Sequence, residues 1–202
     1  EIFADPSPEV GLPLVEFVEI HNPGKDTLDL EGWSLNDTQT KGILKKSLLA
    51  PGEFLILCPA ADTIQYKMYG KTAGISPWPS LGNSSDRLVL KSFKNRTVDS
   101  IVYSDTWYDD AKKKQGGWSL ERIDIFSKCS GILNWTTSID TLGGTPGRPN
   151  SVNSRNYDLI PFKADSLIVK SDTTLFLYFN KSSSISSIQL EDFTLKPASG
   201  LI

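Results

Sequence analysis

The sequence predicts an all-β protein, built as an antiparallel β-sandwich. Three observations predict this fold class. Short apolar or alternating runs recur at roughly ten-residue spacing, clusters of Pro, Gly, Asn and Asp separate them, and no long amphipathic helix interrupts them. About six or seven short strands joined by such turns are typical of a β-sandwich.

The first elements are a strand at residues 2–4 and a hairpin. Alternation of apolar and polar residues over 17–21 is the pattern of a strand with one buried face. Pro23 and Gly24 suit the central positions of a type II turn. The apolar residues of 28–35 then supply a returning strand. We therefore predict a β-hairpin that ends in Trp33, a large structural anchor.

The later elements follow in chain order. A turn at 50–53 leads into a strand at 54–58, after a polar connection at 38–46. Residues 59–80 contain several prolines and glycines, so we expect a long loop with one helical turn. A second hairpin is predicted from 88–91 and 97–103, and a further strand from 118–123.

The composition changes after residue 142, where Gly, Pro, Asn and Ser dominate. We predict a first domain at 1–152, a linker at 153–161, and the truncated N-terminal part of a second β-sandwich at 162–202. Strand patterns in this last part lie at 166–169, 174–179 and 188–195. Three strands are too few to bury a core of their own.

The composition is that of an ordinary folded protein. The 202 residues are 39% hydrophobic and 22% charged, with a formal net charge of −3. This balance disfavours a dedicated nucleic-acid binder, which carries a basic excess on one face. No apolar run reaches the ~20 residues of a membrane span. Because the chain starts at Glu1 inside a strand pattern, we take it as a processed or trimmed product.

Two cysteines leave two alternatives open. Cys58 and Cys129 are either buried free thiols or one disulfide that ties the strand 54–58 to the loop at 127–131. The disulfide requires an oxidising compartment.

Motifs for nucleophilic or zinc chemistry are missing from the sequence. His21 is the single histidine, and a Ser or Cys triad would need it as the base. The segment 117–120, Gly-Trp-Ser-Leu, lacks the second glycine of a nucleophile elbow. One histidine and two distant cysteines do not make a zinc set. We therefore expect no catalytic residue and a structural or solvated histidine.

Glu16 is the carboxylate that the strand pattern directs toward the core, since it shares its parity with Val18. A carboxylate in that position needs a partner. Arg122, which has the parity of Trp118, and Arg87 are the candidate partners. We therefore expect structural roles for Glu16, Trp118 and Arg122.

Calcium is the alternative use of the acidic residues, although we expect no cofactor. The ion takes six to eight oxygen ligands. Candidate ligands are Glu16 or Glu19 with Asp5 or with the loop acids Asp105, Asp109 and Asp110. The loop spacing does not match an EF-hand. A pair of carboxylates could alternatively serve a hydrolase, with the carboxyl groups about 5–9 Å apart.

Trp78, Trp107 and Tyr108 lie in predicted loops. Aromatic side chains in loops stack on sugars or anchor a protein partner. Their alternative role is to cap the open end of the sandwich. Short lysine runs at 45–46 and 112–114 are expected to be solvated faces, not phosphate sites.

Several motifs, taken together, resemble the lamin tail domain family. They are EFVEIHN at 16–22, GWSLND at 32–37, APGE at 50–53, LGNSSDRLVL at 81–90 and DSIVY at 99–103. The motifs DPSP at 5–8, YSDTWY at 103–108, GWSLER at 117–122 and GGTPG at 143–147 are similar to bacterial members, which occur in secreted and cell-surface proteins, often of Bacteroidetes type. The resemblance covers about residues 1–152 and implies an immunoglobulin-like sandwich. Residues 160–202 resemble, more loosely, bacterial Ig-like domains.

The resemblance implies no catalytic activity. We expect a non-catalytic interaction or spacer module of an exported bacterial cell-surface protein, located in the periplasm, at the outer surface or outside the cell. Its partner would be a protein or a glycan, bound through loops or an exposed strand edge. The alternatives are a nucleic-acid-binding accessory domain of a nuclease-like protein and the carboxylate-based hydrolase.

Overall fold

A computed structural model describes residues 1–127, 131–155, 163–180 and 189–194. The chain divides into two compact units, Glu1–Tyr157 and Asp158–Ile202. The division falls inside the predicted linker, most of which lies outside the described residues. Among the described residues, no helix has the length and apolar character needed to cross a bilayer.

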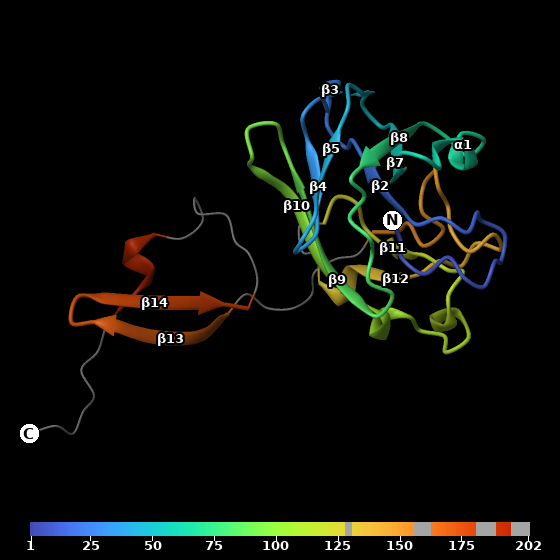
Figure 1. The fold of residues 1–202 in the computed structure, drawn as a ribbon. Helices are drawn as coiled ribbons and strands as arrows, with labels where there is room; N and C mark the ends of the chain where they lie inside the picture. Colours follow the sequence, from blue (N-terminus) through green and yellow to red (C-terminus); the bar gives the residue numbers. More distant parts are fainter. Residues whose placement is uncertain (128–130, 156–162, 181–188, 195–202) are drawn as a thin grey trace, which may run out of the picture. The chain divides into compact units, whose positions relative to one another are not determined.

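Within the described part of the first unit, ten strands form one continuous sheet in the order β10-β9-β4-β5-β8-β7-β2-β1-β11-β12. The sheet folds over on itself into two layers (Figure 1). All neighbours are antiparallel except β7 and β8. The predicted all-β sandwich is therefore confirmed, with one parallel pair that the sequence did not indicate. The elements are β1 (Ile2–Phe3), β2 (Phe17–His21), β4 (Ser34–Asn36), β5 (Lys41–Leu44), β7 (Phe54–Pro59), α1 (Thr63–Tyr66), β8 (Thr72–Ser76), β9 (Ser85–Lys91), β10 (Thr97–Ser104), β11 (Leu120–Arg122) and β12 (Trp135–Thr137), with a separate pair β3 (Leu28–Asp29) and β6 (Leu48–Leu49).

Apolar side chains from both layers fill the interior of the sandwich. Val18, Leu57 and Leu120 come from one layer, and Leu35 and Leu88 from the other. Each is more than nine-tenths buried. Burying one such side chain stabilises the fold by roughly 1.5–3 kcal/mol, so this core holds the two layers together.

Strands β1, β2 and β7 bury their second face as well. Phe3, Phe17 and Ile56 point away from the interior and pack with Tyr66 of α1. The rings of Phe17 and Tyr66 lie 5.1 Å apart in an edge-on arrangement. The period-two pattern of 17–21 predicted one buried face, but a second layer of structure covers the other face too.

The predicted hairpin over 17–35 is wrong. β2 pairs with β1 and β7, whereas β4 pairs with β5 and β9. After β2, the Asn22 side-chain amide donates to Asp26 O (2.8 Å) and to Leu49 O (2.9 Å). These bonds lead the chain to the β3–β6 pair instead of back along β2. A local turn signal cannot reveal such long-range partners.

Besides the two-residue β6, three short strands lie in segments without a predicted strand. β5 lies in the predicted polar connection, β8 lies in the predicted long loop, and β12 follows β11. With three to five residues each, these strands are too short to show a clear alternation. The predicted helical turn is α1, and the predicted second hairpin is the β9–β10 pair.

The second unit contains an antiparallel hairpin of β13 (Ala164–Ser171) and β14 (Thr174–Phe179). Both strands were predicted. The predicted strand at 188–195 is wrong for its described part, because Leu190–Asp192 forms a 3₁₀ turn. Asp192 Oδ2 accepts a hydrogen bond from Gln189 N (2.8 Å) and stabilises this turn. Residues 188 and 195 lie outside the described residues.

Candidate functional site

The two ends of the large sheet lie close together at one side of the sandwich. β10 is the last strand at one end of the sheet and β12 at the other. Arg122 Nη1 on β11 lies 3.1 Å from Asp99 Oδ2 on β10. We call the opening between β10 and the β11–β12 pair the seam. At the seam, the sheet stops short of closing into a barrel.

An apolar pocket of about 290 Å³ opens at the seam, and we call it the seam pocket. The apolar residues that line it come from both layers and include Ile2, Val18, Leu35, Leu88, Ile101 and Trp135. Its polar lining includes His21, Asn150 and the Asp99–Arg122 pair. The volume is near the lower end of the range for ligand pockets and suits one or two apolar side chains.

β10 presents an edge that no other described strand covers. It pairs with β9 only. Val98 is an extra residue in this ladder, because Thr97 pairs with Lys91 and Asp99 with Leu90. From Asp99 to Ser104 the pairing is regular. Ser100 N donates to Asp99 Oδ1 (2.8 Å). The other outward N–H and C=O groups of that stretch can pair with an added strand.

Arg122 and Trp135 form one wall of the seam pocket. The guanidinium carbon of Arg122 lies 5.7 Å from the centre of the Trp135 ring. In the described part of the chain, Arg122 Nε and Trp135 Nε1 are buried without a hydrogen-bond partner. A buried donor without a partner costs roughly 1–3 kcal/mol. These two N–H groups in the wall of the pocket can therefore still donate to an acceptor on a ligand.

A different polar cluster lies on the opposite face of the same strands. The pairing of β1 with β2 and β11 places Glu1 between Glu19 and Glu121. All three side chains are more than nine-tenths buried. Directly opposed like charges destabilise a sheet. This glutamate ladder therefore needs either hydrogen-bond donors or protons.

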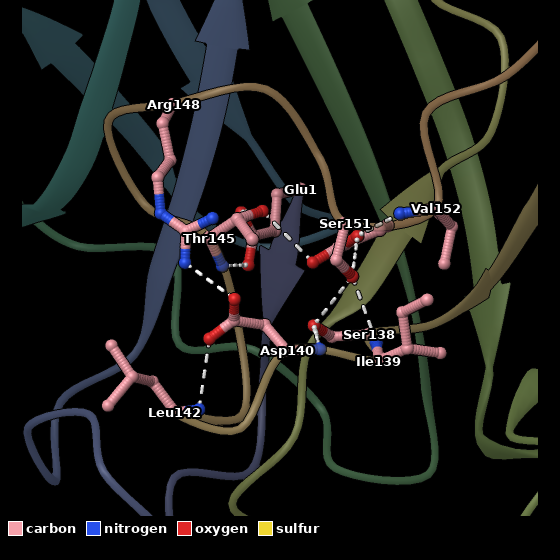
Figure 2. Close-up of polar contacts among 10 residues, drawn as sticks. Glu1, Ser138, Ile139, Asp140, Leu142, Thr145, Arg148, Ser151 and Val152 are labelled. Carbon is pink, nitrogen blue, oxygen red and sulfur yellow. Dashed lines mark hydrogen bonds and ion pairs between the residues drawn. The ribbon is translucent and has the colours of Figure 1, made fainter.

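A segment at 143–152, which we call the strap, supplies donors to the ladder (Figure 2). Thr145 N donates to Glu1 Oε1 (2.8 Å), and Gly147 N donates to Glu19 Oε2. Ser151 Oγ (2.8 Å) and Val152 N (3.1 Å) donate to Glu121 Oε2. The strap is thus bound to the sheet mainly through its contacts with the three glutamates.

Two glycines allow the strap to approach so closely. A Cβ on Gly144 would lie 2.5 Å from Glu1 Oε1. Gly147 has φ +83°, and its Cβ would lie 2.1 Å from Tyr69 O. Both distances are shorter than real contacts, and a positive φ disfavours residues with a side chain. Steric crowding therefore explains why the GGTPG motif at 143–147 has glycine at positions 144 and 147.

Burial changes the titration of two ladder residues. The pKa of Glu19 is raised to about 8. Burial is the largest cause and the neighbouring Glu1 and Glu121 carboxylates add to it, against the lowering effect of the positive amino end and the Gly147 N–H. Burial also raises the pKa of Glu1, again with a contribution from Glu121. Glu1 and Glu19 therefore retain protons at pH values where an exposed glutamate has lost its own.

Glu16 has different partners from those predicted. Its Oε2 accepts hydrogen bonds from Trp78 Nε1 (2.6 Å) and from Leu81 N (3.1 Å). The predicted pairing with Arg122 or Arg87 is wrong, since Arg122 pairs with Asp99. Glu16 is indeed hydrogen-bonded, but a tryptophan and a backbone amide take the place of an arginine.

The predicted binding aromatics are tied into the fold. Trp78, Trp107 and Tyr108 are partly buried and pack against the core. Tyr108 donates its hydroxyl to Trp118 O (2.8 Å). The rings of Trp107 and Trp135 lie 6.4 Å apart. These contacts support the capping role, and ligand binding by these residues stays a prediction. Trp33 also packs against the core.

The predicted calcium ligands have other contacts. Asp105 forms an ion pair with Lys114 (3.3 Å), and Asp110 Oδ1 accepts from Lys112 N (2.7 Å). Asp109 donates its backbone N–H to Thr137 Oγ1 (3.2 Å). Among the described residues, no three His, Cys, Asp or Glu side chains are grouped to hold a metal ion. A calcium site that uses these acids stays a prediction.

His21 and Cys58 have ordinary structural surroundings. The His21 ring stacks on Phe54 with 4.5 Å between centroids, and burial lowers its pKa. Cys58 is a buried free thiol, whose pKa burial raises to about 11. Cys129 lies outside the described residues, so the pairing of the two cysteines stays a prediction.

The seam and the ladder were not predicted from the sequence. Two signals for the ladder were visible in retrospect: glutamates at equivalent positions of three strand-like runs, and the glycine-rich motif at 143–147. The seam left no local signal, because its sides come from strands at opposite ends of the sheet.

Comparison with known proteins bears on the first unit. A family profile described as the lamin tail domain matches residues 1–105, the segment that ends just after β10. No curated protein matches the chain.

Proposed function

The chain belongs to the lamin tail domain family, whose module is immunoglobulin-like and non-catalytic, and we propose that this module binds a protein partner at the seam. One observation carries the proposal. An eight-residue edge strand, β10, lies beside an apolar pocket and has one side that no other described strand covers.

The binding mode that fits this arrangement is strand addition. An extended partner segment would pair its backbone with Asp99–Ser104 of β10. Alternate side chains of an added strand point the same way, so one apolar side chain would enter the seam pocket. Backbone pairing supplies affinity in this mode, and the pocket supplies selectivity.

Two features of β10 restrict which strands can pair. The bulge at Val98 interrupts the regular ladder, and Asp99 points inward to Arg122. Bulges and inward charges are the devices by which proteins prevent indiscriminate edge pairing. A partner strand must therefore align with Asp99–Ser104, beyond the bulge. This requirement favours one specific partner segment over arbitrary exposed strands.

The seam favours a protein partner over the other classes. Its pocket is mostly apolar, whereas a glycan needs several converging polar groups beside an aromatic platform. The net charge of −3 gives no support for nucleic acid. The ladder carboxyl groups do not suit a hydrolase, since both oxygens of Glu1 and of Glu121 already take part in hydrogen bonds to the strap.

We also propose that the module belongs to an exported bacterial surface protein, as an interaction or spacer domain. The support is the resemblance of the DPSP, YSDTWY and GGTPG stretches to bacterial members found in such proteins. Antibody labelling of intact cells that carry the parent protein tests this. Labelling only after lysis would contradict it.

Selection of peptides from a random library on the immobilised protein tests the binding function. We expect peptides with apolar residues at alternate positions. Val98→Arg, which places a charge at the seam pocket, should weaken their binding at least tenfold. Val169→Arg makes the same change on β13, where Val169 is 69% exposed, and should leave binding unchanged.

Parallel arms distinguish the other partner classes. A glycan array and DNA retention at ~50 and ~200 mM salt are run on the same protein. DNA retention that falls steeply with salt would replace the proposal with the nucleic-acid role. Glycan binding that Val98→Arg leaves intact, or no peptide binding at all, would also overturn the seam as the site.

A further inference from the structure

The hydroxyl of Thr145 lies between two carboxyl groups of the glutamate ladder. Thr145 Oγ1 is 3.1 Å from Glu1 Oε2 and 2.9 Å from Glu121 Oε1. Thr145 itself is fully buried, so bulk solvent does not reach this contact. Figure 2 shows the strap residue Thr145 facing Glu1.

A count of hydrogens constrains this contact. A hydroxyl has one hydrogen to donate and two lone pairs with which to accept. If both carboxyl groups were ionised, one of the two oxygen–oxygen contacts would have no hydrogen between its atoms. The second oxygen of each carboxyl group does not supply the missing hydrogen, because Glu1 Oε1 and Glu121 Oε2 already accept from Thr145 N and Val152 N.

We propose that Glu1 and Glu121 share one proton in the folded protein and that the strap is a latch which this proton closes. The protonated carboxyl donates to Thr145 Oγ1, and the Thr145 hydroxyl donates to the ionised carboxyl. Loss of the proton leaves two like charges on either side of one hydroxyl. The strap then loses a bond at its centre and opens.

The charged groups around the pair do not substitute for this proton. On β2, Glu19 adds a further carboxyl, and the amino group of Glu1 donates to the backbone O of Glu19 (3.3 Å). On the strap, Arg148 pairs with Asp140 (2.7 Å). Lys113 donates to Ser138 O (2.7 Å). Among the described residues, no Lys or Arg forms an ion pair with a ladder carboxylate. Burial favours the neutral form of Glu1.

Glutamine provides a direct test, because its amide imitates a protonated carboxyl. In Glu1→Gln, the amide oxygen can accept from Thr145 N while the amide NH₂ donates to Thr145 Oγ1. The Thr145 hydroxyl then donates to an ionised Glu121. In Glu121→Gln, the new amide NH₂ donates to Thr145 Oγ1, and the Thr145 hydroxyl donates to an ionised Glu1. Both variants should fold and should keep the latch closed at alkaline pH.

The first readout is the titration of side-chain carboxyl carbons by NMR. In the unmodified protein, the Glu1–Glu121 pair should titrate in two separate steps. In Glu1→Gln, the step at the higher pH should disappear. Titration of both carboxyl groups in one step in the unmodified protein would overturn the shared proton.

The second readout is hydrogen exchange of the strap amides, corrected for the intrinsic effect of pH on exchange. The opening constant of the strap should rise by up to tenfold per pH unit below the second titration step and level off above it, because opening releases the proton only while the closed strap still holds it. In Glu1→Gln and Glu121→Gln this rise should be lost apart from the part that Glu19 contributes through its bond to Gly147 N, while the exposed control Glu53→Gln should behave as the unmodified protein does. An opening constant that is independent of pH, or whose rise with pH is the same in Glu1→Gln as in the unmodified protein, would overturn the latch.

Discussion

Replacement of Glu19 by Gln should change how the stability of the first unit depends on pH. In the folded protein, burial raises the pKa of Glu19 to about 8, from the 4.5 of an exposed glutamate. Between these values the unfolded chain loses the proton and the folded chain keeps it. The unfolded state therefore gains from rising pH, and the free energy of unfolding falls over this window.

The size of the effect follows from the same two values. Each pH unit between them lowers the free energy of unfolding by about 1.4 kcal/mol, to a limit of roughly 5 kcal/mol. Below pH 6.5, His21 acts in the opposite direction, because its lowered pKa makes the fold more stable as pH rises. Between pH 6.5 and 8 the loss from Glu19 is about 2 kcal/mol, a large part of the 5–15 kcal/mol of a typical domain.

Urea unfolding at several pH values from 6.5 to 9, followed by tryptophan fluorescence, measures this loss. We expect a falling stability in the unmodified protein and a much flatter profile in Glu19→Gln, with a remainder from Glu1, whose pKa is also raised. Glu53→Gln is the control, since the Lys71 bond lowers the pKa of Glu53 and confines its effect to acid pH. A stability that is constant or rising from pH 6.5 to 8, or equal slopes in the two proteins, would show that Glu19 does not hold a proton in the folded protein over this range.

Three further predictions concern the same contacts. The double variant Glu1→Gln/Glu121→Gln should be less stable at pH 7 than either single variant by about 1–3 kcal/mol, because both amides donate to Thr145 and its hydroxyl loses its acceptor. Additive effects of the two single variants in urea unfolding would contradict this. Gly147→Ala should destabilise the fold by more than about 1 kcal/mol, since φ is positive there and the new Cβ meets Tyr69 O. An unchanged midpoint of urea unfolding would argue against the strap geometry. Trp78→Phe should cost about 1.5–3 kcal/mol through the lost bond to Glu16, and Glu16→Gln should reduce that difference in a double-mutant cycle.

The sequence predicted those parts of the fold that depend on neighbouring residues. The β9–β10 hairpin, the strand at 54–58 and the helical turn near Tyr66 were predicted, because each has its signal within about ten residues. The partners of β2 and β4 were not, since Asn22 directs the chain to Leu49 through contacts that no local pattern encodes. Short strands such as β12 offer too few residues for any period to show.

The candidate site was harder to predict than the fold for a physical reason. Glu19 alternates with Val18 and Ile20, a pattern in which the polar residue faces water. It is buried because the strap, more than a hundred residues later, covers that face through Gly147. The seam likewise joins Asp99 to Arg122. Trp78 shows the reverse error. Its position in a loop suggested ligand binding, but its indole N–H donates to the partly buried Glu16 carboxyl.

The most direct test of the proposed function is to follow the backbone amide resonances of the protein as a selected peptide is added. If a strand is added at the seam, shifts should concentrate on Asp99–Ser104 and on seam-pocket residues such as Ile101 and Trp135, with new protection from exchange along β10. Shifts confined to the loops around Trp78 and Tyr108, with β10 unchanged, would contradict it and would favour the loop aromatics as the binding surface.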